Sequence, residues 1–379
     1  MGHNRKHHYI PQFYLRGFSS GSRKIIDVYH MPTNKRITDV AIKNQAQRQN
    51  FYGNIKYEKF LASIESKIAP PLIHLRENAV VPKYSSDDYI SLQMLLLSTL
   101  SRTEKARNER DSAMTKSVKL ILEEIPEHQD LLEHQNLMTE NSSHFALESL
   151  FEFLLYISDL KLGIVRCSEH AFFGTDSPVN LVNPFLESRI KNRSVTGLVE
   201  RGLVMIMPVS SQITLIAYDP WVYKFRSKNN VLDIGSQEVE YYNLLQGVCM
   251  ERVAYCSAFT RTSLIRNAIT KAKRFRPGSR SRVRFEKLYM DNDPEPKDMI
   301  AMSRWEPRLG IIPPGLKFLR FAKNIPLSDT AVQIRNPILY DMIRRREHPT
   351  GKADVQEMIA DIREHLGQEK DKKKVRESF

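Results

Sequence analysis

The sequence has few cysteines and no long hydrophobic run, and each absence excludes a class of protein. Its 379 residues include three cysteines, Cys167, Cys249 and Cys256, whose spacing matches neither a zinc site nor a redox pair. We expect them to be buried as small apolar side chains in a reducing cytoplasm. No window approaches the roughly 18 uninterrupted apolar residues of a membrane span. The basic N-terminus is not followed by an apolar stretch of signal-peptide length. The sequence therefore predicts a soluble, cytoplasmic protein.

Several motifs of familiar enzyme classes are also missing. The chain contains no His-Glu-x-x-His, no Gly-rich phosphate loop and no Gly-x-Ser-x-Gly elbow, which argues against a metalloprotease, a nucleotide kinase and an α/β-hydrolase. We find no internal repeat. A divalent metal held by His7 or His8 with Asp176 and one further acid stays open as a cofactor, although no spacing requires it.

Basic residues, in contrast, are abundant, and they are concentrated. The formal net charge is +13, which favours a polyanionic partner such as RNA or DNA, or an anionic membrane surface. Between residues 261 and 284 the chain has no Asp or Glu and nine basic residues, namely Arg261, Arg266, Lys271, Lys273, Arg274, Arg276, Arg280, Arg282 and Arg284. Such a block can bind phosphates. The alternative is a solvated helix followed by a flexible basic loop.

The apolar periodicity predicts an α+β fold that is mainly helical in its first half. Strands at 24–30 and 36–40 around a turn at 32–35 predict an N-terminal hairpin. Strand-like runs at 164–167, 171–174, 203–207 and 213–217 predict an antiparallel sheet region around 164–217. Helices are predicted at 57–76, from 85 to about 123, at 145–160 and at 239–252.

The same patterns suggest how the chain is divided. We expect a core domain at 1–260, a basic linker segment at 261–284 and a C-terminal extension at 285–379. The extension shows no clear period until a helical pattern at 338–366, and a charged tail follows at 368–379.

A family resemblance begins in the N-terminal stretch at 7–18, which reads HHYIPQFYLRGF. Further matching segments are LSTLSRT at 97–103, FGTDSPV at 173–179, MPVS at 207–210, and the helix around Asn243 that leads to VAYCS at 253–257. As an ordered set these segments resemble domain of unknown function family 4238 over about residues 7–260, a mostly bacterial family without a settled activity. The family usually has Thr-Ser and Asn where this chain has Gly174-Thr175 and Ser177, so an amide after Asp176 is not implied here.

Four residues are candidates for catalysis. His7 and His8 can transfer protons near neutral pH, but adjacent residues of a strand point to opposite faces, so we expect one in a site and the other packed on the core. Asp176 ends an apolar strand just before Pro178, where it is either an acid facing a cleft or a residue that binds backbone in a turn. Arg102, near the end of an apolar helix, needs a carboxylate or a phosphate, and a pair with Asp176 is expected.

From these residues we predict a protein that acts on nucleic acid. The leading hypothesis is a nuclease, more specifically an RNase, and the family resemblance loosely implies a toxin-like or antiphage role. One histidine would accept a proton from the 2′-hydroxyl or from water, and Arg102 would stabilise the phosphorane. There are two alternatives. One is a non-catalytic module that binds nucleic acid or protein, in which the N-terminal motif acts as a structural latch. The other is an enzyme that acts on a small phosphorylated or nucleotide substrate. Candidate binding residues are Gln12, Tyr14, Arg16, Ser177, Asn243, Lys271, Lys273, Arg274 and Arg276.

Overall fold

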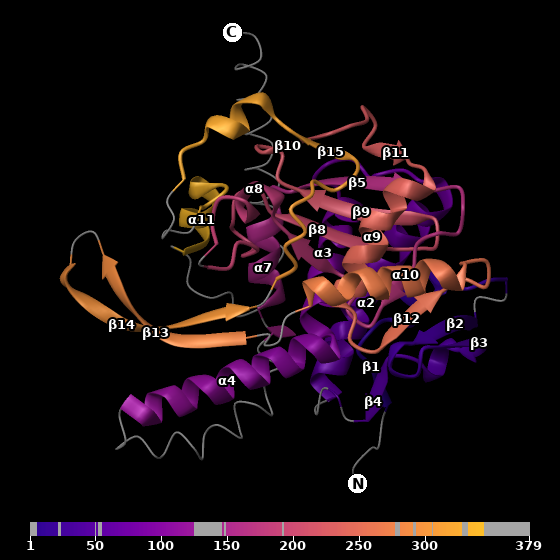
Figure 1. Cartoon of the computed structure of the whole chain (residues 1–379), viewed down its shortest axis with the longest axis horizontal. Helices are drawn as coiled ribbons and strands as arrows, with labels where there is room; N and C mark the ends of the chain where they lie inside the picture. The colour runs from indigo at the N-terminus through magenta and orange to yellow at the C-terminus, as the bar shows by residue number, and fades with distance from the viewer. Residues whose placement is uncertain are drawn as a thin grey trace.

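The α+β fold is confirmed by a computed structural model of the chain (Figure 1). The structure describes residues 6–21, 24–49, 51, 55–124, 146–147, 149–191, 193–276, 281–290, 293–304, 306–327 and 333–344. A five-stranded sheet has the order β11-β5-β9-β8-β7. Its strands are β5 (Lys161–Arg166), β7 (Asn180–Val182), β8 (Val204–Pro208), β9 (Ile213–Tyr218) and β11 (Val231–Asp233). All of its pairings are antiparallel except that of β11 with β5.

Alternation along the central strands places this sheet between two apolar layers. Met205 and Met207 of β8 face a layer formed with helices α2 (Ile55–Asn78), α3 (Asp87–Arg102) and α7 (Leu150–Ile157). Val204 and Ile206 face the opposite layer, formed with α8 (Pro184–Glu187) and α9 (Ser236–Cys249). Because successive side chains of a strand point to opposite faces, a run in which every residue is apolar marks a strand that is covered on both sides.

A second sheet carries the N-terminal hairpin. Its order is β3-β2-β12-β6, with β2 (Ile25–His30), β3 (Lys35–Ala41), β6 (Gly174–Thr175) and β12 (Val253–Cys256). The short helix η2 (Met31–Thr33) joins β2 to β3 and ends at Asn34, whose φ of 53° lies in the left-handed region that Asn tolerates. The predicted hairpin is therefore present. Of the strand predicted at 171–174, only Gly174 is in a strand, β6, which belongs to this second sheet.

The long central helix that we predicted is in fact two helices. Ser86 accepts a hydrogen bond from the Tyr89 N–H and begins α3, which ends at Arg102, and α4 (Glu104–Glu124) follows. Thr103 between them is extended (ψ 155°), and its Oγ1 accepts a hydrogen bond from the Ala106 N–H. Thr103 thus caps a new helix, a role that threonine fulfils well, although the apolar spacing continues past it.

The segment predicted to be a basic linker contains regular structure. It holds α10 (Thr262–Ala272), which packs against α9, then η4 (Lys273–Phe275) and the start of β13 (Ser281–Met290). β13 pairs with β14 (Asp293–Arg304) in a hairpin beside α4 (Figure 1). β15 (Leu316–Phe318) pairs with β10 (Tyr223–Phe225), and η5 (Arg320–Asn324) and α11 (Pro337–Arg344) follow. The rest of the helix predicted at 338–366, and the tail at 368–379, lie outside the described residues.

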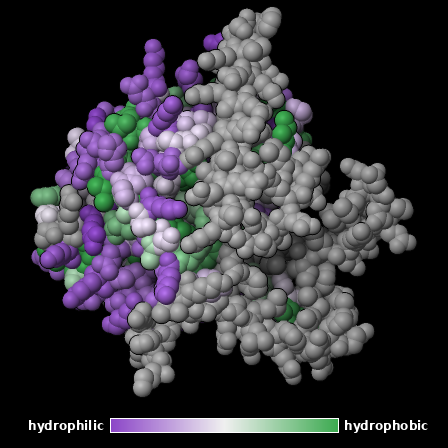
Figure 2. All heavy atoms as spheres, turned by 180° about the vertical axis from the view of Figure 1, so that it is seen from behind, coloured by the Kyte–Doolittle hydropathy of each residue, from purple (hydrophilic) through white to green (hydrophobic). Residues whose placement is uncertain are grey.

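The three cysteines are buried, as predicted. In the described part of the chain, no helix combines the length and the apolar character needed to cross a membrane. Figure 2 views the molecule from behind, and its coloured part is mostly hydrophilic, with hydrophobic residues in small separate groups. The remaining elements are short: β1 (Lys6–His8), α1 (Gln12–Leu15), η1 (Arg16–Phe18), η3 (Ile42–Asn44) and β4 (Gln47–Gln49).

Candidate functional site

The apolar residues of the N-terminal motif anchor it to the core. Ile10, Tyr14, Leu15 and Phe18 are fully buried. The Tyr14 hydroxyl, which we had counted as a binding group, donates to the carbonyl of Pro208 at the end of β8 (2.8 Å). Gly17 lies so close to the same strand end that a Cβ would meet the Val209 carbonyl oxygen at 2.2 Å. This half of the motif therefore packs into the core.

Arg76 of α2 fixes the motif from the other side. Its guanidinium donates to the carbonyls of Phe13, Tyr14 and Val209. Burial lowers the pKa of Arg76 to about 10, so the side chain remains a cation at neutral pH. One charged side chain thus binds the C-terminal carbonyls of α1 and the β8–β9 turn together.

His7 and His8 lie on β1, which pairs with β4, and they have separate partners. The His7 Nε2 contacts a carboxylate oxygen of Glu58 on α2. The His8 Nδ1 lies 3.0 Å from the Gln45 carbonyl, and its Nε2 lies 3.0 Å from the Gln12 amide nitrogen. A carbonyl can only accept, so Nδ1 must carry the proton, and the neutral Nε2 then accepts from the Gln12 NH₂. Burial lowers the pKa of His8, which favours this neutral form.

Arg102 and Glu65 complete a cluster around His8. The Arg102 Nη1 donates to Glu65 Oε1 (2.7 Å), with the Arg102 side chain 1% exposed and that of Glu65 33% exposed. Among the residues that the structure describes, none accepts a hydrogen bond from the buried Arg102 Nε. Both charges act on the pKa of His8, which Glu65 raises and Arg102 lowers. We call His8, Gln12, Glu65 and Arg102 the His8 cluster; it combines a basic nitrogen, a fixed cation and a carboxylate that reaches solvent.

Asp176 does not belong to this cluster, and the expected Arg102–Asp176 pair is wrong. The Asp176 carboxylate accepts hydrogen bonds from the backbone N–H groups of Glu251, Arg252 and Val253 (2.7–3.0 Å). Burial raises its pKa to about 6, although the three N–H groups act in the opposite direction. Asp176 therefore joins the end of β6 to the turn between α9 and β12, and its role is structural.

The other candidate binding residues are dispersed. Arg16 is exposed, Ser177 is buried, and the Asn243 Nδ2 donates to the Ala171 carbonyl (2.9 Å). On α10 and just beyond it, Lys271 pairs with Glu240 and the Arg276 guanidinium donates to the Gly247 carbonyl. Lys273 is exposed, and Arg274 is exposed with its guanidinium over the Phe275 ring. The basic segment is thus partly engaged in packing.

Comparison with known proteins places this geometry in a family. The model of a family described as "Protein of unknown function (DUF4238)" matches residues 6–258. The chain belongs to the DUF4238 family. No curated protein and no solved structure matches it.

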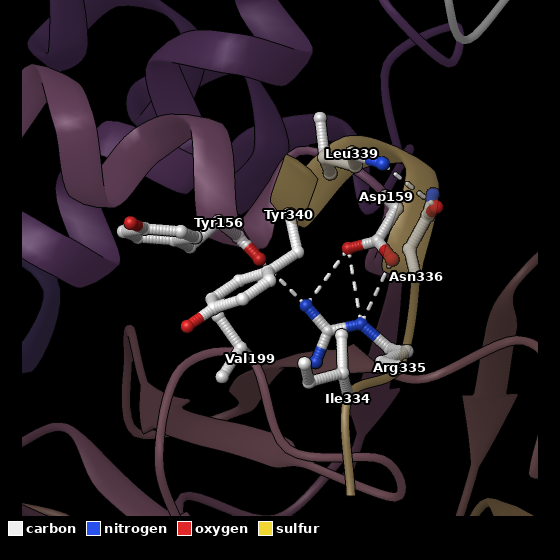
Figure 3. Close-up of a pocket in the computed structure, with 8 residues that line it drawn as sticks. All are labelled: Tyr156, Asp159, Val199, Ile334, Arg335, Asn336, Leu339 and Tyr340. Atoms are coloured by element: carbon white, nitrogen blue, oxygen red, sulfur yellow. Dashed lines mark hydrogen bonds and ion pairs between the residues drawn. The ribbon is translucent and has the colours of Figure 1, made fainter. Parts of the chain in front are cut away.

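The DUF4238 match contains the whole His8 cluster, whereas a second polar cluster crosses its boundary. Asp159, inside the match, binds Arg335, outside it, through two guanidinium nitrogens at 2.8–3.0 Å, and both side chains are almost completely buried (Figure 3). The cavity here, which Tyr156, Val199 and Tyr340 also line, has a volume of about 10 Å³. That is about the space of one water molecule and far below the roughly 300–1,000 Å³ of small-molecule sites, so we assign this place to structure.

Sequence reasoning identified three members of the His8 cluster and missed the fourth, Glu65. Glu58 and Glu65 lie seven residues apart on α2, which is about two helical turns, so they share one face of the helix. Glu58 contacts His7, and Glu65 raises the pKa of His8. That spacing is the signal that could have found them. No group of three or more His, Cys, Asp or Glu side chains suited to a metal ion occurs among the residues that the structure describes.

Proposed function

We propose that this DUF4238 protein cleaves RNA by general acid–base catalysis at the His8 cluster. The observation that carries the proposal is the fixed neutral tautomer of His8, whose basic Nε2 lies in the same cluster as a buried arginine with a spare N–H. A general base in one cluster with a fixed cation is an arrangement that can cleave a phosphodiester.

The roles follow from the chemistry of the groups. Once Gln12 is displaced by substrate, the His8 Nε2 accepts the proton of a 2′-hydroxyl, and that oxygen attacks the adjacent phosphorus. Arg102 donates to the phosphorane oxygens and stabilises their charge. The imidazolium of His8 then returns its proton to the departing 5′-oxygen. Glu65 positions Arg102, and its partial exposure marks the side from which substrate approaches.

The charge of the protein supports a polyanionic substrate. Besides the net charge of +13, Arg48 lies opposite His7 in the β1–β4 pairing and is 53% exposed. Its partner Glu104 is 37% exposed at 3.1 Å, and surface pairs of this kind contribute little. Arg48 is therefore able to exchange Glu104 for a phosphate on the face of β1 that carries His7.

The adjacent histidines provide a matched test. Purified wild type, His8→Gln and His7→Gln are incubated with labelled total RNA, tRNA and single- and double-stranded DNA, with Mg²⁺, Mn²⁺ or EDTA. His8→Gln should lower the cleavage rate by roughly 10²–10⁴-fold, whereas His7→Gln, which changes a contact to Glu58, should retain most of it. Equal activity in all three proteins would contradict the assignment, and equal loss in both variants with a matching fall in melting temperature would show a structural role only.

The second candidate function is a module that binds nucleic acid or protein without cleaving it. Its support is that Asp176, Tyr14 and Asn243, three of the expected site residues, each bind backbone groups and hold the fold. Salt-sensitive binding without cleavage of any substrate would favour this module over the nuclease. A toxin-like or antiphage role is a further part of the proposal, tested by comparing growth and phage plaques in cells expressing wild type or His8→Gln.

A further inference from the structure

One aromatic ring is held in solvent by an ordered turn. Phe259, between β12 and α10, is 68% exposed. Its turn is fixed by hydrogen bonds from the Ala258 N–H to Ser20 Oγ (2.8 Å) and from the Thr260 N–H to the Ser257 carbonyl (2.9 Å). The backbone is therefore built to hold a large apolar side chain out of the core, which the hydrophobic effect alone does not explain.

A second ring lies against it. The ring centroids of His170 and Phe259 are 5.0 Å apart with an interplanar angle of 39°. His170 comes from the loop between β5 and β6, and its Nδ1 lies 2.7 Å from Ser211 Oγ. Two loops far apart in the sequence thus bring together two rings, one carried on a hydrogen-bonded turn and the other bonded through its own Nδ1. We call His170 and Phe259 the aromatic pair.

Cations border the aromatic pair. Arg261, two residues beyond Phe259, is 66% exposed and pairs with the exposed Glu169 at 3.5 Å. Such a pair is weak in water and leaves the guanidinium available. Ser211, which contacts His170, also donates its N–H to the Gly17 carbonyl (3.4 Å), and the exposed Arg16 is the residue before Gly17.

We propose that the aromatic pair is a stacking platform for the bases of single-stranded RNA, with Arg261 and Arg16 binding the adjacent phosphates. Aromatic rings beside cations are how proteins bind single strands without reading sequence. In a duplex the faces of the bases are covered by their neighbours, so an exposed ring selects unpaired nucleotides. The proposal rests on the proposed function, since it specifies the substrate of the same enzyme. The α1–η1 segment links the two places, because Gln12 at its start contacts His8 and Gly17 near its end contacts Ser211.

The test measures binding separately from cleavage. Fluorescence anisotropy with labelled oligouridine of about 12 nucleotides, within the usual site size of single-strand binding folds, is recorded in the His8→Gln background, together with an RNA duplex of the same length. Phe259→Ala should weaken single-strand binding about 5- to 150-fold, the equivalent of one stacked base. Phe259→Tyr should restore it, and duplex binding should not change.

Phe321 on η5 is the matched control, because it is also a phenylalanine and is 56% exposed. Phe321→Ala should bind oligouridine like the parent protein. Unchanged binding in Phe259→Ala, or an equal loss in both variants, would overturn the platform. Binding that depends on Phe259 without any RNA cleavage by the wild type would leave the platform standing and remove the nuclease. Cleavage by the wild type with unchanged binding in Phe259→Ala would support the nuclease and overturn the platform.

Discussion

Removing Arg335 should destabilise the whole protein, although it lies outside the DUF4238 match. Its side chain is 2% exposed and that of Asp159 is 1% exposed. The guanidinium also donates to the carbonyls of Glu200, Tyr156 and Leu198. Arg335→Met keeps most of the side-chain volume but removes the charge and all of these hydrogen bonds, so it isolates the polar contribution.

The size of the effect follows from burial. Breaking a buried ion pair from one side leaves an uncompensated charge and costs about 3–5 kcal/mol. For a domain of this size that corresponds to a fall in melting temperature of up to roughly 6–20 °C. Replacing both partners, as in Asp159→Leu with Arg335→Met, should recover part of the loss, because hydrophobic pairs can substitute for buried ion pairs.

The penalty should also depend on pH. Burial raises the pKa of Asp219 from 3.8 to about 6, and Arg335 lowers it in part. Without Arg335 this folded-state pKa is higher still. A carboxyl with a raised folded-state pKa contributes stability that is complete below about pH 4 and is lost as the pH rises through the folded-state value. Arg335→Met should therefore be more destabilised, relative to wild type, at pH 8 than at pH 5.

The assay is urea unfolding followed by circular dichroism at both pH values. Arg166→Met is the control, because Arg166 pairs with Asp233 at the surface, where the two side chains are 45% and 67% exposed; it should cost less than about 1 kcal/mol. If Arg335→Met is no more destabilised than this control, or if its penalty is the same at both pH values, the reasoning is wrong.

Three further predictions concern the N-terminal motif. Gly17→Ala should lower the free energy of unfolding by about 1–3 kcal/mol because the added methyl meets a backbone carbonyl. Gly235→Ala is the control and should change it much less, because its methyl meets nothing within 4 Å. Equal changes in urea unfolding would contradict this prediction. Tyr14→Phe should cost about 1–3 kcal/mol because it leaves the buried Pro208 carbonyl without its donor; calorimetry measures it, and an unchanged melting temperature would refute the latch. Because burial lowers the pKa of His8 below 6.5, the rate of RNA cleavage should fall only below that pH; an acid limb above pH 6.5 in the pH–rate profile would exclude His8 as the base.

Much of the fold could be predicted from the sequence because its strands and helices have distinct patterns. β8 and β9 are apolar at nearly every position, and the structure covers both of their faces. The division of the central helix could not be predicted, because Thr103 caps α4 through its own hydroxyl while the apolar spacing continues across it. Local propensity does not distinguish a threonine inside a helix from one that begins the next helix.

The candidate site was predicted only in part, and the reason is geometric. His8 and Arg102 could be named from residue type and position, but the carboxylate that Arg102 meets lies 37 residues earlier on α2. Asp176 was assigned to catalysis because sequence cannot show that its partners are three backbone N–H groups. Every residue except proline has a backbone N–H group, so the residue types in the sequence do not show which of these groups will bind a carboxylate.

Beyond residue 258, the described segment 306–322 and Arg335 pack into the same core as the DUF4238 match. The Glu306 carboxylate accepts from the N–H groups of Val195 and Thr196, Leu316 and Ala322 are buried in the layer that contains α9, and Arg335 neutralises Asp159. Each contact satisfies a polar group or covers an apolar face that residues 6–258 alone would leave open. The aromatic pair and the Asp159–Arg335 ion pair each join a residue inside the match to a residue outside it. Residues beyond the match therefore contribute both to stability and to the proposed binding of RNA.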